Sequence, residues 1–150
     1  MFSPSPFSIE DIPLDDAATN TRVTVDGNVT LSVHTAGRGP AVLLLHGYPQ
    51  THFIWRHLGP RFAEQFSVVA PDLKGYGASD APAATTDSST YSKRAMAADC
   101  VALMRSLGHE RFAVIGHDRG GRVAYRMAFD HPERITKLVT LDIIPTGAMW

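Results

Sequence analysis

The chain has 150 residues, of which 44% are hydrophobic and 19% are charged, a balance typical of one globular domain with a sizeable core. Its formal net charge of -1, without a basic stripe, argues against nucleic acid and anionic membranes as partners. A single cysteine excludes an internal disulfide, and the amino terminus lacks a signal-peptide pattern. No apolar segment approaches the roughly 20 residues that span a bilayer, so we expect a cytoplasmic protein.

Strand and helix patterns alternate along the sequence. Residues 1–20 are rich in Pro, Ser and Asp and are predicted to lead into a domain at 21–150. Alternating polar and apolar residues around an Asp-Gly-Asn turn predict a β-hairpin at 22–34. Continuous apolar runs then predict buried strands at 41–45, 66–70, 112–115 and 135–141. Helical spacing recurs between them at 53–62, 91–107 and 123–129.

This alternation predicts an α/β fold with a mostly parallel, doubly wound sheet that opens with an antiparallel hairpin. In such sheets, ligands bind beyond the carboxyl ends of the strands. Four polar residues directly follow predicted strands, namely His46, Asp72, Asp118 and Asp142. We therefore expect the functional site at this edge of the sheet.

Asp118 stands at the centre of the sequence Gly116-His117-Asp118-Arg119-Gly120, between a buried strand and a helix. A nucleophile elbow has this pattern, in which a strand is followed by G-x-acid-x-G and then by a helix. The glycines let the strand and the helix approach closely. An isolated Asp before a helix is more often an N-cap. Two glycines at the required spacing favour the elbow, and Asp118 is the predicted nucleophile.

A carboxylate at the elbow implies different chemistry from the usual serine. It is ionised at pH 7 and needs no base to attack an sp³ carbon that carries a leaving group. The product is an ester, which water can cleave, whereas serine would form an ether that is not readily hydrolysed. The elbow therefore favours displacement of a halide or opening of an epoxide.

Arg119 and Arg122 lie three residues apart at the start of the predicted helix and can share one face. A helix N-terminus with two guanidinium groups is a good site for a carboxylate. We predict that they clamp the carboxylate of a small acid that bears its leaving group on the adjacent carbon. The alternative is that both point to solvent or pair with acidic residues.

The loop after strand 41–45 and the residue after the nucleophile supply the oxyanion-hole N–H groups in this architecture. We assign them to the backbones of Tyr48 and Arg119. Asp142 could orient a catalytic histidine, although a strand-end Asp is more often a turn former. His46 and His117 are expected to be structural, with His46 bound to loop backbone.

These residues resemble the α/β-hydrolase family and, within it, the haloacetate (fluoroacetate) dehalogenases. The resemblance rests on anchors at 46–52, 72–77, 91–97, 116–120 and 141–146. The first two are generic to α/β-hydrolases, whereas Asp118 followed by Arg119 and Arg122 is specific. The resemblance implies that Asp118 is the nucleophile, Arg119 and Arg122 are the carboxylate clamp, and Asp142 is the acid of the triad.

The resemblance also implies what the 150 residues do not contain. In that family the base histidine, the halide pocket of a cap and the last strands come later in the chain, so this sequence corresponds to the amino-terminal half. The implied activity is hydrolysis of a haloacetate to glycolate, without a metal or organic cofactor, in an enzyme that often forms homodimers. The alternatives are an epoxide hydrolase with the same nucleophile and a non-catalytic protein that binds carboxylates.

Overall fold

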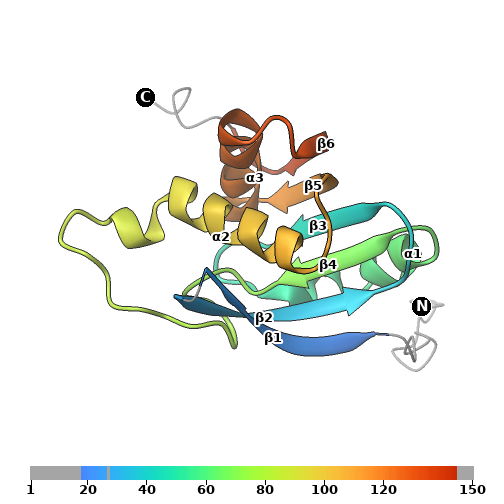
Figure 1. The fold of residues 1–150 in the computed structure, drawn as a ribbon, viewed down its shortest axis with the longest axis horizontal. Helices are drawn as coiled ribbons and strands as arrows, with labels where there is room; N and C mark the ends of the chain where they lie inside the picture. Colours follow the sequence, from blue (N-terminus) through green and yellow to red (C-terminus); the bar gives the residue numbers. More distant parts are fainter. Residues whose placement is uncertain (1–17, 27, 145–150) are drawn as a thin grey trace, which may run out of the picture.

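One six-stranded sheet runs through residues 18–26 and 28–144, the parts of the chain that the computed structural model describes (Figure 1). Its strands are β1 (Thr19–Val25), β2 (Val29–Ala36), β3 (Ala41–Leu45), β4 (Ser67–Pro71), β5 (Phe112–His117) and β6 (Ile135–Leu141). Their order is β1-β2-β4-β3-β5-β6. The first two strands form an antiparallel hairpin, β2 pairs antiparallel with β4, and the rest are parallel. The predicted fold class is confirmed.

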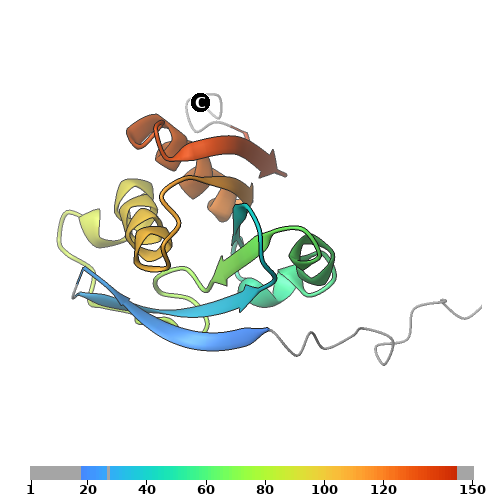
Figure 2. The same ribbon diagram turned by 45° about the vertical axis from the view of Figure 1, so that its right-hand side comes forward.

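Helices cover both faces of this sheet (Figure 2). One face carries α2 (Lys93–Ser106) and α3 (Arg119–Asp130), which also pack against each other. The other carries the 3-10 helix η2 (His52–Trp55) and the short α1 (Gly59–Ala63). A second 3-10 turn, η3 (Ser89–Tyr91), leads into α2.

The apolar run of β3 is continuous because both of its faces are buried. Leu43 and Leu45 belong to the core beneath α2 and α3. Val42 and Leu44 alternate with them and pack on the opposite face, around Trp55. Side chains of successive strand residues point to opposite faces, so a strand that feeds two cores must be apolar at every position.

The predicted helix at 53–62 is divided into η2 and α1. Gly59 and Pro60 stand at the division, where α1 begins. Pro60 is tolerated in this first turn but could not donate an N–H within a continuous helix. The helical spacing at 53–62 includes the aromatic residues Phe53 and Trp55, which would be expected in the core. Trp55 is buried, whereas Phe53 is 62% exposed, so for Phe53 that expectation is wrong.

The last strand, β6, was predicted to be a buried core strand and is largely exposed instead. Leu138, Val139 and Leu141 are each about two-fifths exposed. In the described part of the chain β6 is the edge of the sheet, paired only with β5. A sequence pattern reports hydrophobicity, and the burial of a strand depends on what packs beside it.

The predicted lead-in lies outside the described residues except for its last three positions. Of these, Thr19 and Asn20 already belong to β1, where they pair with Thr35 and His34 of β2. Positions 145–146 of the last anchor also lie outside the described residues. Within the described residues, no helix is both long enough and apolar enough to cross a membrane.

Candidate active site

Asp118 occupies a sharp turn between β5 and α3, with backbone angles φ 48° and ψ -116°. A residue other than glycine rarely adopts a positive φ, so this conformation is strained and must be held by its surroundings. A Cβ atom on Gly116 would overlap the backbone carbonyl of Gly120, so the crossing of strand and helix requires a glycine there. The local geometry is that of the predicted elbow.

The carboxylate of Asp118 is turned toward the loop after β3. The backbone N–H of Tyr48 donates to its Oδ2 at 2.9 Å. Although Asp118 holds the N-cap position of α3, its side chain makes no capping hydrogen bond to that helix. The alternative of a simple N-cap therefore does not describe the side chain.

The surroundings of Asp118 keep it ionised. Desolvation, the largest single influence, raises the pKa of Asp118, but the backbone N–H groups of Tyr48 and Arg119 and the nearby His117 outweigh it. The net pKa is lowered. The two N–H groups predicted as oxyanion donors thus both stabilise the ionised form of the Asp118 carboxylate.

Arg119 extends from the elbow into a cavity of about 300 Å³. Its guanidinium donates to the Tyr76 hydroxyl at 2.9 Å and lies 4.7 Å from the centroid of the Tyr48 ring. Arg122, one turn further along α3, is half-buried, and both arginines lower the pKa of Lys93. The two predicted clamp residues therefore both place positive charge beside the elbow, close to Lys93.

Lys93, which also lines this cavity, is a site residue that sequence reasoning missed. It is the first residue of α2 and was hidden within a stretch that reads as an ordinary amphipathic helix. A signal was available, because a cation at the start of a helix is disfavoured by the helix dipole. Tyr76 and Tyr91 of the cavity wall were missed as well. Tyr76 falls in loop sequence, and Tyr91 stands at the first position of the predicted helix at 91–107 but ends the turn η3 in the structure.

Asp142 follows β6, and the structure brings it to the side of the elbow. The backbone N–H of Asp118 donates to the carbonyl of Leu141, and His117 Nε2 lies 3.8 Å from Asp142 Oδ2. Asp142 has a positive φ of 52°, and its side chain is 91% exposed. His117 Nδ1 is 3.1 Å from Oε1 of Gln50, which ties the histidine to the loop after β3.

His46 is structural, as expected. It is fully buried, and its Nε2 accepts a hydrogen bond from the backbone N–H of Leu73 at 2.9 Å. The ring proton therefore resides on Nδ1, which donates to the carbonyl of Gly47 at 2.8 Å. Burial, the largest influence, lowers the pKa of His46 and keeps the ring neutral. The ring fastens the loop after β3 to the loop after β4.

Asp72 organises the loop after β4. Its buried carboxylate accepts from the backbone N–H groups of His52 and Ala78, at 2.8 and 3.0 Å, and from His52 Nδ1 at 2.7 Å. Desolvation raises the pKa of Asp72, but these hydrogen bonds prevail and lower it to about 2. All four predicted strand-end residues thus lie at the carboxyl edge, two in the elbow region and two as supports.

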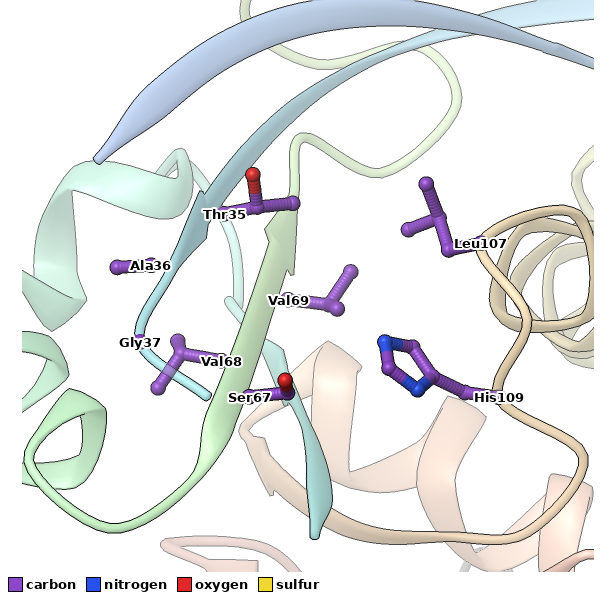
Figure 3. Close-up of a pocket in the computed structure, with 8 residues that line it drawn as sticks. All are labelled: Thr35, Ala36, Gly37, Ser67, Val68, Val69, Leu107 and His109. Atoms are coloured by element: carbon purple, nitrogen blue, oxygen red, sulfur yellow. The ribbon is translucent and has the colours of Figure 1, made fainter. Parts of the chain in front are cut away.

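A second cavity, of about 220 Å³, lies at the opposite end of the sheet (Figure 3). It is lined by the end of β2, the start of β4 and the residues that follow α2, and His109 is its one ionisable lining residue. No predicted site residue lines it. Its lining includes no carboxylate, lysine or arginine of the described residues, so we place the candidate site at the elbow.

A family model described as the alpha/beta hydrolase fold matches residues 40–150. The chain belongs to the α/β-hydrolase family. This α/β-hydrolase is 51% identical over 124 residues to the fluoroacetate dehalogenase of Burkholderia sp, covering 83% of this chain and 41% of that relative. It is 46% identical over 111 residues to the soluble epoxide hydrolase of Corynebacterium sp. (strain C12), covering 74% and 37%.

A solved structure from Nostoc sp PCC 7120, assigned to the α/β-hydrolases, superposes with a TM-score of 0.86 at 50% identity. The match covers 88% of this chain and 45% of that one. The chain therefore spans less than half the length of each of these relatives. The predicted haloacetate dehalogenase resemblance is confirmed as a similarity, while the relatives include enzymes named for two different substrates.

Proposed function

We propose that the protein is a hydrolase that removes halide from a haloacetate, with Asp118 as the nucleophile. The observation that carries the proposal is an ionised carboxylate, rather than a hydroxyl, at a strained elbow whose neighbouring N–H groups point at it. A carboxylate can displace a leaving group from alkyl carbon and still be regenerated by hydrolysis of the resulting ester.

In the first step, one carboxylate oxygen attacks the α-carbon while the carbon–halogen bond breaks, and the halide leaves with the bonding electrons. The hydrogen bond from Tyr48 distinguishes the two oxygens. Oδ2 accepts from this backbone N–H, which favours Oδ1 as the attacking oxygen and Oδ2 as the ester carbonyl. The guanidinium groups of Arg119 and Arg122 hold the substrate carboxylate in position for this attack.

In the second step, water attacks the ester carbonyl and negative charge develops on Oδ2. The N–H groups of Tyr48 and Arg119 already act on this carboxylate, so they are pre-positioned as oxyanion donors. Cleavage of the acyl–oxygen bond releases glycolate and restores Asp118. A histidine beyond residue 150, oriented by Asp142, would take the proton of the attacking water.

The cationic surroundings favour a halogenated acid over an epoxide. Arg119, Arg122 and Lys93 lie close enough for both arginines to perturb the lysine electrostatically. A neutral epoxide gains nothing from these charges, whereas a carboxylate offsets them. The 51% identity to a fluoroacetate dehalogenase supports the same choice, and the 46% identity to an epoxide hydrolase makes the epoxide the second candidate.

The proposal is tested by halide release in the full-length protein, with fluoroacetate, chloroacetate and a neutral epoxide as alternative substrates. Asp118→Asn keeps the shape of the side chain and removes its charge. We expect it to lower halide release by on the order of 10³-fold or more, with the fold checked by circular dichroism. Undiminished release by this variant would reject Asp118 as nucleophile, and faster turnover of the epoxide would favour the second candidate.

The clamp is tested in the same assay with chloroacetate and its neutral analogue chloroacetamide. Replacing Arg119 or Arg122 with Leu removes a charge-assisted hydrogen bond to the carboxylate. We expect KM for chloroacetate to rise by about tenfold or more, and KM for chloroacetamide to change little. An equal loss on both substrates would reject the clamp.

A further inference from the structure

The cavity beside the elbow contains more positive charge than a two-arginine clamp requires. Its wall includes the side chains of Arg119, Lys93 and Lys74, together with three tyrosines. Arg119 reaches into it along the Tyr48 ring toward the Tyr76 hydroxyl. These three cations belong to three different segments, so only the folded chain brings them together.

Lys74 and Lys93 differ in how their charge is balanced. Lys74 is buried, and its ammonium lies 2.7 Å from the carboxylate of Asp99 on α2. Lys93 is half-buried and forms no ion pair with a carboxylate of the described residues. The ammonium of Lys93 is thus the lysine charge in this cavity that remains available to a ligand.

The position of Lys93 is electrostatically unfavourable without an anion. It begins α2, Arg119 begins α3, and neither helix carries an acidic residue in its first turn. A helix N-terminus disfavours cations, and like charges that share a partly desolvated region repel one another. Desolvation, Arg119 and Arg122, in that order, lower the pKa of Lys93, and together they outweigh Tyr125 and the Asp118 carboxylate, which raise it.

We infer that Lys93 is a third cation of the substrate site, which binds the carboxylate together with Arg119 and sets a preference for anionic substrates. This inference rests on the proposed function for the identity of the ligand, a small monocarboxylate. The carboxylate of Asp118 also acts on Lys93, which places the lysine within electrostatic reach of the reacting centre. A carboxylate that binds here offsets the repulsion among the cations. The site therefore binds a carboxylate more tightly than a neutral ligand of the same shape.

The test compares Lys93→Met with Arg94→Met in the full-length protein. Arg94 is the neighbouring residue on α2, but its exposed side chain pairs with Asp130 and lines no part of the cavity. Both variants remove one positive charge from the same helix turn. Losing a cation at a helix N-terminus does not destabilise the helix, so both variants are expected to fold.

For Lys93→Met we expect KM for chloroacetate to rise about tenfold, kcat to change by less than about threefold, and KM for chloroacetamide to stay unchanged. Lys93→Arg should restore most of the affinity, and Arg94→Met should leave all three quantities as in the wild type. The inference is overturned if Arg94→Met matches Lys93→Met, or if the neutral amide is affected as strongly as the acid.

Binding of acetate, measured by calorimetry in wild type and Lys93→Met, separates this inference from the proposed function. If the wild type releases no halide but binds acetate about tenfold more tightly than the variant, the proposed function fails and the anion site stands. If the wild type dehalogenates chloroacetate and the variant binds acetate equally well, the proposed function stands and the role of Lys93 is rejected.

Discussion

At the scale of single residues, the site is defined by what surrounds Asp118. Its carboxylate is held by an N–H from a residue 70 positions earlier in the chain. Gly47 makes this contact feasible, because a Cβ there would lie 2.6 Å from Asp118 Cβ and 2.7 Å from Oδ2. The loop after β3 must therefore pass directly over the nucleophile.

Gly47→Ala should displace the carboxylate from the Tyr48 N–H, since the added methyl group meets the Asp118 side chain. We expect kcat for haloacetate to fall by tenfold or more, because the oxyanion donors lose their alignment. Steady-state halide release measures this effect.

Gly59→Ala is the matched control, because a Cβ at Gly59 meets no atom within 4 Å. It should leave kcat as in the wild type. An unaltered kcat in Gly47→Ala would mean that the loop moves without consequence, and that the Tyr48 contact does not contribute to catalysis.

At the scale of elements, α2 links the core to the cavity. Its inner face carries Met96, Cys100 and Leu103 into the core, and its first residue, Lys93, reaches the cavity. The start of the helix is fixed by Ser92, whose side chain accepts a hydrogen bond from the N–H of Ala95 at 3.1 Å. The direction in which Lys93 leaves the helix depends on this cap.

Ser92→Ala should lower the free energy of unfolding by about 1 kcal/mol, because the capping hydrogen bond is lost. Urea denaturation measures the change. Ser106→Ala, at the other end of the same helix, removes a hydroxyl that, among the described residues, donates to the carbonyl of Leu103, and it should cost less. A larger loss at Ser106 than at Ser92 would contradict the role of the cap.

Two predicted helices show when hydrophobic periodicity alone is enough to predict a helix. The stripe that predicted a helix at 91–107 corresponds to α2, because its spacing continues for several turns without interruption. The shorter pattern at 53–62 became η2 and α1, since Gly59 and Pro60 interrupt the backbone. Periodicity predicts which residues are apolar on one face, but a break in backbone hydrogen bonding overrides it.

At the scale of the whole molecule, Asp72 connects the end of β4 to a segment 20 residues earlier in the chain and orders the loop that follows it. It joins the end of β4 to η2 through His52 and to the following loop through Ala78. Its pKa in the folded protein is about 2, below the ordinary value of 3.8. Between these two values the unfolded chain binds a proton that the folded chain does not.

The stabilisation from Asp72 is therefore complete above about pH 4 and is lost as the pH falls through about 2. The difference in pKa corresponds to about 2 kcal/mol of unfolding free energy. We expect the unfolding free energy of Asp72→Asn, measured by denaturation between pH 2 and 6, to lack this part of the pH dependence.

Asp87→Asn provides the control. The pKa of Asp87 is also lowered to about 2, by hydrogen bonds from Thr85 and Ser89 within its own loop, but the residue is exposed. These contacts join residues only two positions apart and can also form in the unfolded chain, so the pKa of Asp87 changes little on unfolding and the wild-type pH dependence should persist. If Asp72→Asn shows the same pH dependence as the wild type, the Asp72 cluster does not connect the segments as described.

The sequence by itself determined the strand and helix alternation, the elbow, and the positions of charged residues at strand ends. These features are local, because each depends on the pattern of a few neighbouring residues. Asp118 between two glycines after an apolar run is an example, and so is the pair Arg119 and Arg122 at the start of a helix. His46 could also be identified as a support, and Asp72 as a residue of the same edge, since strand ends of a parallel sheet converge.

Only the tertiary structure decided which of these groups meet. The N–H of Tyr48 is directed at Asp118, Lys93 joins Arg119 in one cavity, and Lys74 is paired with Asp99. Each of these contacts joins segments that are separated along the chain by many residues. Their geometry follows from how strands order in the sheet and how helices cross it, and no local pattern of residues encodes a distance between two loops.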